Sequence, residues 1–232
     1  MDYGWFSFVA KPLFMALHYI YERWPHNYGW AIVLLTIIIT IATFPLKLKS
    51  IRSAQKMQKI APLVKSIQDR YKEYKFNDPR KQRMNQEVMK IYSEHGINPL
   101  GGCLPMLLQL PFLYGFYRVL DLSIELRHAP WFWWVQDLSA PDPLYILPVV
   151  MTVTMFIMQK MTPMMTADPA QARMMMMMPL VFGFMFITFP SGLVLYWLTS
   201  NVVGIAQQML LNRFMPPPPP ITPPRKVVSA KS

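Results

Sequence analysis

The sequence predicts an all-α integral membrane protein: five transmembrane helices around a hydrophilic groove, plus an amphipathic interfacial helix and a cytoplasmic helical hairpin. Two observations lead to this fold class. The apolar residues are gathered in blocks long enough to cross a hydrocarbon core of roughly 30 Å, which takes about 20 residues of helix. The charged residues, 23 Lys or Arg and 12 Asp or Glu among 232 residues, fall almost entirely between those blocks.

The first 27 residues predict an amphipathic helix at the membrane surface. Aromatic side chains are mixed there with charged or titratable ones, namely Lys11, His18, Glu22 and Arg23. Such a mixture suits the membrane–water interface, although Pro12 interrupts the pattern. An ordinary buried helix of a soluble domain is the alternative left open. The start lacks a basic region and a small-residue cleavage site, so we expect no signal peptide and a chain that begins directly with this helix.

Five apolar blocks predict the spans. They cover residues 28–46, 100–120, 144–161, 174–189 and 192–211. The Pro-Ser-Gly sequence at residues 190–192 predicts a tight turn between the last two spans. Together with a basic loop at residues 47–97, the spans are expected to form a core at residues 28–215.

The charges of the connecting segments predict the orientation. Residues 47–99 hold 13 Lys or Arg against 5 Asp or Glu, a net charge of +8, whereas residues 118–143 hold 2 against 4, a net charge of −2. Residues 160–173 hold 2 against 1, and residues 212–232 hold 4 against none. Because basic segments stay in the cytoplasm, every span agrees with a periplasmic amino terminus and a cytoplasmic carboxyl terminus.

The basic loop predicts a helical hairpin. Apolar side chains recur at spacings of three and four on both sides of a turn at residues 76–79. They are Met57, Ile60, Val64, Ile67, Tyr71 and Tyr74 before the turn, and Met84, Val88, Ile91 and His95 after it. We expect Asp78 to cap the second helix, Pro79 to take its first position and Gly96 to end it. Pro62 is expected to kink the first helix near its start.

Two basic features could meet an anionic partner. Arg80, Lys81 and Arg83 stand at the start of the second hairpin helix, where they are candidate contacts. Residues 216–232 are rich in proline and basic residues, and polyproline is extended and cannot pack a core. We therefore expect a disordered basic cytoplasmic tail.

Polar side chains inside the predicted spans indicate a hydrophilic groove, because such groups seek partners or water in hydrocarbon. Thr36, Thr40 and Thr43 are spaced by four and three residues and therefore share one helix face. The other spans contribute Gln109, Thr152, Gln159, Thr199, Ser200, Asn201 and Gln207. If these faces converge, they form a cavity open to the cytoplasm. Hydrogen bonding within or between helices is the alternative that the residues leave open.

Methionine is abundant, with 20 residues in all and five in a row at residues 174–178. Its flexible and polarizable side chain suits surfaces that accept many apolar partners. Simple packing against lipid is the alternative.

Several kinds of chemistry find no support in the sequence. Cys103 is the only cysteine, so neither an internal disulfide nor a paired-cysteine metal site can form. No His-Glu-x-x-His, Gly-x-Ser-x-Gly or glycine-rich phosphate motif occurs. The interiors of the predicted spans lack the charged residue that a coupled ion transporter usually needs. We therefore expect no enzyme activity, no catalytic residue, no metal and no cofactor.

Six motifs carry a family resemblance. They are Asn-Pro-Leu-Gly-Gly-Cys-Leu-Pro at residues 98–105, Gln-Leu-Pro at 109–111, Glu-Leu-Arg-His-Ala-Pro at 125–130, Asp-Leu-Ser-Ala-Pro-Asp-Pro at 137–143, Gln-Lys-Met at 159–161 and Phe-Pro-Ser-Gly-Leu at 189–193. In these motifs and their order the chain resembles the YidC-type membrane protein insertases of the YidC/Oxa/Albino family, most closely the Gram-negative bacterial branch. The resemblance covers nearly the whole sequence.

The resemblance implies a membrane protein insertase and chaperone of the bacterial inner membrane. A nascent hydrophobic segment would slide along a groove that is open to cytoplasm and lipid, while its polar flank enters the cavity. The implied partners are nascent membrane proteins, membrane lipids, the ribosome and the Sec translocon, without DNA or a small-molecule substrate. Thr36 and Trp197 would contact the substrate, and the groove residues become Thr36, Thr40, Thr43, Gln109, Tyr196, Trp197 and Asn201. A channel or transporter of small solutes and an intramembrane hydrolase are the rival functions.

The chain departs from the family pattern at one groove position. The family usually has an arginine on the first core span, five residues before the proline of a Pro-Leu pair. Pro45 and Leu46 place that position at Thr40. The Gram-negative branch also carries an additional amino-terminal span and a periplasmic domain, which are missing here, so the resemblance implies a truncated chain.

Overall fold

The computed structural model describes residues 7–23, 26–74, 78–98, 104–162, 169–216 and 219. Within them the fold is helical throughout, apart from an isolated antiparallel bridge between Phe132 and Val135. The helices are α1 (Ser7–Arg23), α2 (Tyr28–Ala42), α3 (Phe44–Arg70), α4 (Pro79–Glu94), α5 (Leu104–Leu122), α6 (Ile146–Met161), α7 (Pro169–Phe186) and α8 (Ser191–Phe214), with a 3-10 turn, η3, at Ile124–Leu126. The predicted all-α class is confirmed.

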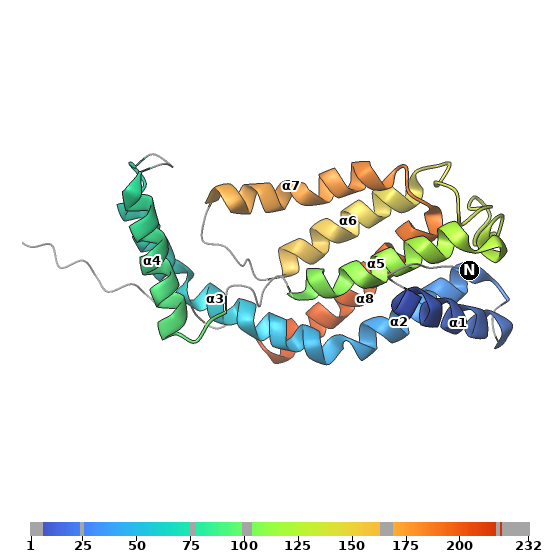
Figure 1. The fold of residues 1–232 in the computed structure, drawn as a ribbon, viewed down its shortest axis with the longest axis horizontal. Coiled ribbons are helices and arrows are strands. Elements are labelled where there is room, and N and C mark those ends of the chain that lie inside the picture. The colour runs from blue at the N-terminus through green and yellow to red at the C-terminus, as the bar shows by residue number, and fades with distance from the viewer. Residues whose placement is uncertain are drawn as a thin grey trace, which may run out of the picture.

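Helices α2, α5, α6, α7 and α8 form an elongated bundle, and α3 and α4 extend from one end of it (Figure 1). Helix α8 packs against α2, α5 and α6, and α7 packs against α6. Large side chains from several helices fill the centre, among them Phe116, Met151 and Tyr196, which are all at most 2% exposed. The bundle therefore has a continuous apolar core with α8 at its centre.

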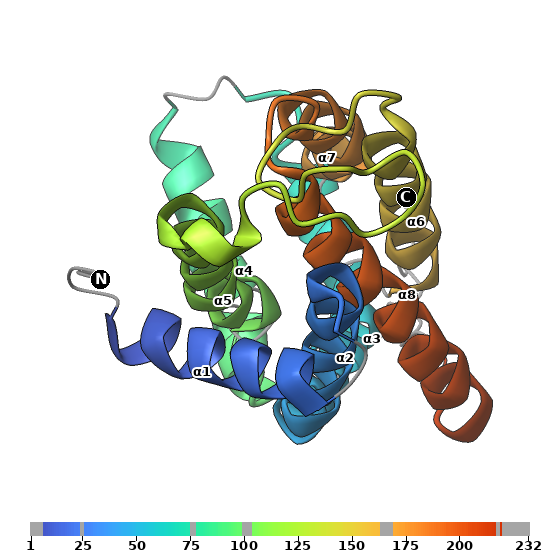
Figure 2. The same cartoon turned by 90° about the vertical axis from the view of Figure 1, so that its right-hand side faces the viewer.

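Helix α1 lies across the end of the bundle opposite the hairpin. Figure 2 shows it running transversely, while the bundle helices are seen nearly end-on. Its inner face buries Ala10, Leu13 and Leu17 in the core, and its outer face exposes Met15 and Tyr19. The predicted amphipathic helix is thus present, and Pro12 lies inside it rather than ending it.

The first predicted span does not end at residue 46 as expected. Helix α2 ends at Ala42, α3 begins at Phe44, and the two are bent by 56°. Pro45 has no amide hydrogen to donate to the carbonyl of Ile41, and a proline ring clashes with the carbonyl four residues before it. The helix therefore breaks just before the proline, and the next helix continues into the hairpin.

Membrane-spanning length is reached in one place among the described residues. No single helix there is both long and apolar enough to cross a membrane, whereas α2 and α3 together could do so across their bend. Two further helices, Ile146–Met161 and Ala172–Phe186, are apolar but shorter. The count of five spans stays a prediction.

The remaining predicted spans correspond to helices with shifted ends. Residues 144–161 match α6 and residues 192–211 match α8 closely, whereas α7 begins at Pro169 and ends at Phe186. Residues 100–103, at the start of the second predicted span, lie outside the described residues, as does the predicted tail apart from positions 216 and 219.

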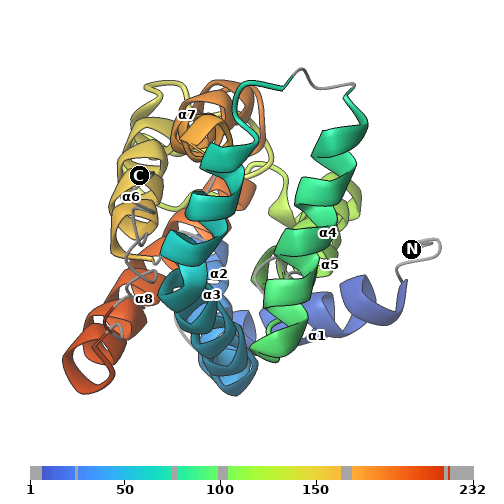
Figure 3. The same cartoon turned by 90° about the vertical axis from the view of Figure 1, so that its left-hand side faces the viewer.

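The predicted hairpin of α3 and α4 is present (Figure 3). Its seam consists of the buried Met57, Ile60, Val64 and Ile97, against which Leu63, Val88, Ile91 and Tyr92 pack. As expected, the Asp78 side chain accepts a hydrogen bond of 2.9 Å from the amide of Arg80, with Pro79 in the first turn. Gly96 follows the helix end with a φ of 61°, which glycine adopts without the penalty of a Cβ atom.

Two details of the hairpin prediction were wrong. Pro62 does not lie near a helix start, because α3 begins already at Phe44 and continues through it. His95 is exposed, because α4 ends at Glu94 and the left-handed Gly96 returns Ile97 to the seam instead.

A loop at residues 123–145 covers the bundle end at which α1 lies. Leu126, Val135 and Leu138 on this loop are fully buried in the core. The amides of Ser191 and Gly192 donate to the carbonyls of Ala140 and Leu138 at 2.7 and 2.9 Å, which ties the loop to the start of α8. This closed end also holds the turn predicted at residues 190–192, which lies slightly earlier than expected because α7 ends at Phe186 and α8 already begins at Ser191.

Candidate functional site

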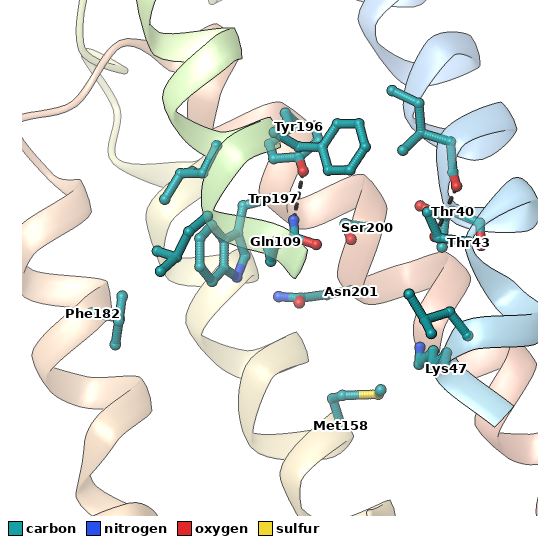
Figure 4. Close-up of a pocket in the computed structure, with 15 residues that line it drawn as sticks. Thr40, Thr43, Lys47, Gln109, Met158, Phe182, Tyr196, Trp197, Ser200 and Asn201 are labelled. Carbon is teal, nitrogen blue, oxygen red and sulfur yellow. Dashed lines mark hydrogen bonds between the residues drawn. The ribbon is translucent and has the colours of Figure 1, made fainter. Parts of the chain in front are cut away.

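A cavity of about 290 Å³ lies between α2, α3, α5, α6, α7 and α8 (Figure 4). Its polar lining consists of Thr40, Thr43, Lys47, Gln109, Tyr196, Ser200 and Asn201. Its apolar lining consists of Ile39, Leu46, Leu110, Phe112, Leu113, Met158, Phe182 and Trp197. Residues more than 150 positions apart in the sequence are therefore brought together around one partly polar space.

Six of the seven predicted groove residues line this cavity, and Thr36 does not. Thr36 is fully buried one helical turn closer to α1, and its hydroxyl donates a hydrogen bond of 2.7 Å to the carbonyl of Ile32. Its helix face is shared with Thr40, but that part of α2 is buried in the core. The structure thus separates Thr36 from the polar space that its neighbours line.

The threonine hydroxyls in the cavity donate to their own helix. Thr40 donates to the carbonyl of Thr36 at 2.7 Å, and Thr43 donates to that of Ile39 at 2.8 Å. The hydroxyl hydrogens of both threonines are therefore used within the helix, which is the alternative that the sequence leaves open. The hydroxyl oxygens of these threonines can still accept hydrogen bonds. Donors that face the cavity must come from other side chains.

Two amide side chains supply such donors from different helices. Gln109 on α5 donates to the phenolic oxygen of Tyr196 on α8 at 2.6 Å. Asn201, about one and a half turns further along α8, donates to the hydroxyl of Thr154 on α6 at 3.3 Å. Figure 4 shows Gln109 and Asn201 on the same side of α8. These bonds connect the cavity wall across three helices.

Trp197 belongs to an aromatic cluster that joins α7 to α8. Its ring lies 5.8 Å from that of Phe182 and 5.3 Å from that of Phe186, measured between centroids. Aromatic pairs at such distances stabilise a contact beyond the area they bury. Trp197 therefore forms a firm apolar wall at the edge of the cavity.

Sequence reasoning missed two polar residues of the lining, Lys47 and Ser200, as well as its apolar residues other than Trp197. In the sequence, Ser200 is one of several polar residues of the last predicted span, and Lys47 belongs to the basic loop. The helix break before Pro45 places Lys47 in the first turn of α3, where it faces back to the cavity. Pro45 was the available signal, because a proline there predicts the break.

An apolar hollow adjoins the polar cavity. It has a volume of about 640 Å³ and is lined by Leu107, Leu110, Pro111, Leu113, Tyr114, Tyr117, Met185, Phe186, Phe189 and Leu193. It lies between α5 on one side and α7 and α8 on the other. Leu110 and Leu113 line both spaces, so the partly polar cavity and the apolar hollow lie next to each other and share part of their walls.

Helix α7 presents its methionines to the surroundings. Met174, Met176, Met177 and Met178 are all exposed, as are Leu180, Val181 and Phe184. The main packing partner of this helix in the bundle is α6. Such a flexible apolar surface can adapt to apolar side chains of different shapes.

The basic residues predicted on the hairpin lie apart from the cavity, at the start of α4. Arg80 donates to both carboxylate oxygens of Asp78 at 3.0 Å, and its guanidinium stands 3.9 Å from the ring centroid of Tyr74. The hydrogen bonds from Arg80 lower the pKa of the Asp78 carboxyl. Arg80 is therefore a structural residue of the turn, whereas Arg83 is exposed and Lys81 partly so.

Metal ligation finds no support in the part of the chain that the structure describes. No three side chains of His, Cys, Asp or Glu come together there in an arrangement that could hold a metal ion.

The chain is similar to known membrane proteins over most of its length. The family described as 60Kd inner membrane protein matches residues 19–218. A membrane protein insertase YidC of Geobacter sp. (strain M21) is 52% identical over 213 residues, which cover 92% of this chain and 38% of that protein. One of Campylobacter jejuni is 47% identical over 213 residues, covering 92% of this chain and 39% of that protein.

A solved structure supports the same relationship. An active YidC insertase, in a crystal structure with the first transmembrane domain resolved, matches with a TM-score of 0.67 at 29% identity. The match covers 88% of this chain and 46% of that chain. The present chain thus spans about two fifths of the length of the relatives that it matches in sequence.

Proposed function

The chain belongs to the 60Kd inner membrane protein family of YidC-type insertases, and we propose that it is a membrane protein insertase and chaperone of the bacterial inner membrane. It transfers nascent hydrophobic segments from the cytoplasmic side into the bilayer and catalyses no covalent step. The observation that carries this proposal is the position of the partly polar cavity beside the apolar hollow, with Leu110 and Leu113 in the walls of both.

The two spaces suit the two parts of an inserting segment. The polar flank of the substrate enters the cavity, where Gln109, Ser200 and Asn201 offer hydrogen-bonding groups. An unpartnered polar group in an apolar medium costs about 2–7 kcal/mol, so these groups lower the barrier for the flank. The apolar part of the substrate lies against α5 and α7, and its burial in lipid at about 25 cal/mol per Å² drives the transfer.

The exposed face of α7 supports a broad choice of substrates. Because Met176 and Met177 can adopt several rotamers, the same surface can pack against different apolar sequences. We infer that this face, together with the apolar hollow, forms the lateral path of the substrate.

The bundle stands in the membrane with the hairpin in the cytoplasm and α1 at the periplasmic surface. The charge pattern of the connecting segments supports this orientation. Exposed aromatic residues at the closed end support the proposed position of the bundle across the membrane. Trp133 is 73% exposed, Phe132 beside it is exposed, and so is Tyr19 on α1. Aromatic side chains of this kind are typical of a membrane interface. The ribosome and the Sec translocon are the proposed partners on the hairpin side and in the membrane.

Reconstitution tests the proposal directly. Purified protein in liposomes should insert a short single-span substrate, measured by protection of the translocated flank from added protease. Ser200→Trp should fill the cavity and lower the inserted fraction several-fold. Val202→Trp is the matched control, because Val202 lies two residues further along α8 and is 51% exposed. Equal insertion by both variants would show that the cavity is not used.

The same liposomes distinguish the rival function. A channel or transporter of small solutes would make them permeable to ions or solutes in the absence of any substrate protein. Solute flux without protein insertion would overturn the insertase proposal in favour of that rival.

A further inference from the structure

We infer that Lys47 is the cation that recognises acidic polar flanks of the substrate, in place of the arginine that Thr40 does not provide. This inference rests on the proposed insertase function and adds a residue that determines which substrates are accepted. The position and surroundings of the Lys47 amine carry the inference.

The bend between α2 and α3 brings Lys47 to the cavity. Thr43 stands at the bend, and Lys47 follows one turn later in α3, so both line the same space. The Lys47 side chain is half-buried, unlike that of Lys49, which is exposed on the same helix. Because α3 leads into the hairpin, Lys47, which lies below Thr40 and Thr43 in Figure 4, is on the hairpin side of the cavity. A flank from the cytoplasm would arrive there.

Gln207 holds the amine in place. The Nζ atom of Lys47 donates to Oε1 of Gln207 at 3.3 Å, and Nε2 of Gln207 donates to the carbonyl of Thr40 at 3.2 Å. Gln207 is buried on α8, so one amide side chain connects the amine, the end of α2 and α8. The amine is thereby positioned next to the residue that corresponds to the family arginine.

The cavity offers this cation no acidic partner. None of the described residues that line it is Asp or Glu, and the Lys47 ammonium group has three N–H donors, of which Gln207 takes one. Gly204 leaves space for the amine, because a Cβ atom at this position would lie 3.1 Å from the Nζ atom of Lys47 and 3.3 Å from the Cε atom of Met158. A carboxylate entering the cavity would therefore meet an uncompensated positive charge.

The partly buried setting strengthens this attraction. Opposite charges attract more strongly in a medium of lower dielectric constant than in water, and salt screens a partly buried pair less than an exposed one. The fit is to an Asp or Glu side chain of the substrate flank. A neutral flank would use the amide and hydroxyl groups of the cavity instead.

The decisive experiment compares two single-span substrates in liposomes, identical except for two Asp or two Asn residues in the translocated flank. The measured quantity is the inserted amount of the acidic substrate divided by that of the neutral one. Lys47→Gln should lower this ratio at least about fivefold, as expected when a charge-assisted hydrogen bond becomes a neutral one. Lys47→Arg should keep the ratio, and adding Thr40→Arg to Lys47→Gln should restore it.

Lys49→Gln is the matched control, since it removes the same charge from the exposed side of the same helix and should leave the ratio unchanged. An unchanged ratio in Lys47→Gln, or an equal fall in Lys49→Gln, would overturn the inference. If the unsubstituted protein inserts neither substrate, the proposed function itself fails.

A second measurement decides the question without any variant. A carbodiimide joins an amine to a carboxylate in direct contact, so it should cross-link the Asp flank to Lys47 in the unsubstituted protein. Peptide mass mapping that places the cross-link on Lys47 supports the inference. Cross-links on Lys49 or on hairpin lysines, with none on Lys47, would contradict it.

Discussion

Gln109 on α5 and Tyr196 on α8 share a hydrogen bond of 2.6 Å, in which the amide of Gln109 donates to the phenolic oxygen. The Tyr196 ring is buried and stacks on that of Phe116, with centroids 4.4 Å apart. The bond therefore links α5 to α8 at the wall of the cavity. Because α5 lines both the cavity and the apolar hollow, its position shapes both.

Removing the phenolic oxygen should destabilise this link. Tyr196→Phe deprives the partly buried Gln109 amide of its acceptor, at a cost of about 0.5–1.5 kcal/mol for one hydrogen bond, and should lower the thermal midpoint of the detergent-solubilised protein. Gln109→Leu added to Tyr196→Phe should cost less than the sum of the single changes. Tyr19→Phe, at an exposed tyrosine of α1, serves as control. Strict additivity in the cycle would argue against the bond.

Helix α2 should tolerate no side chain at Gly29. A Cβ atom there would collide with the ring of Trp131, which is itself enclosed by Trp30, Phe132 and Trp134. Gly29→Ala should therefore destabilise the protein by about 1–3 kcal/mol, as overpacking does, measured as a lower thermal midpoint.

Gly115 on α5 provides the comparison for that prediction. A Cβ atom there would lie 2.8 Å from the Cδ1 atom of Leu13, the end of a flexible side chain that can move aside. Gly115→Ala should thus be much milder than Gly29→Ala. A reversed order of the two thermal midpoints would refute this account of the closed end.

The hairpin should be sensitive to alkaline pH through Tyr71. Its hydroxyl donates to Glu87 at 2.6 Å, and this hydrogen bond raises the pKa of the Tyr71 phenol above its ordinary 10.0. A raised pKa in the folded state means that the stabilisation is complete below pH 10.0 and is lost as pH rises through the folded-state value. The link between α3 and α4 should therefore loosen only above about pH 10.

Absorbance at the phenolate band measures this titration. The difference between the unsubstituted protein and Tyr71→Phe isolates the single tyrosine, and its midpoint should fall toward the ordinary value in Glu87→Ala. A midpoint that does not respond to Glu87→Ala would show that the bond does not control the titration.

The tip of the hairpin should bind ribosomes by its charge. Because Arg80 is engaged by Asp78 and Tyr74, Lys81 and Arg83 are the groups free for phosphates on this turn of α4. Lys81→Gln with Arg83→Gln should weaken ribosome co-sedimentation and reduce its salt dependence by about two charges. Arg52→Gln with Lys56→Gln removes equal charge from exposed positions near the root of α3, and should weaken it less. Equal losses would point to a general effect of net charge.

The proposed orientation predicts opposite accessibility of the two ends of the bundle. In a Cys103→Ser background, a membrane-impermeant thiol reagent added from the periplasmic side should label Trp133→Cys but not Lys72→Cys, since these exposed residues lie at opposite ends. Permeabilisation should then expose the second site. Labelling of Lys72→Cys from the periplasmic side would contradict the proposed orientation and indicate the opposite one.

The pattern of residues along the chain determined most of the helices. Apolar blocks, the spacing of the hairpin seam and the cap at Asp78 are local signals that depend on helix period and on the nearest few residues. Polarity and the family resemblance also indicated six groove residues that the structure places around one cavity, namely Thr40, Thr43, Gln109, Tyr196, Trp197 and Asn201.

Only the tertiary structure decided which of the polar groups meet, because that depends on helix packing and on the direction of each helix axis. Thr36 shares a helix face with Thr40, yet it lies where α2 is buried, so it is shut off from the cavity. Lys47 belongs by sequence to a basic loop, yet the 56° bend before Pro45 turns it toward Gln207 on α8. A helical period specifies which residues share a face, whereas packing against distant helices specifies what that face meets.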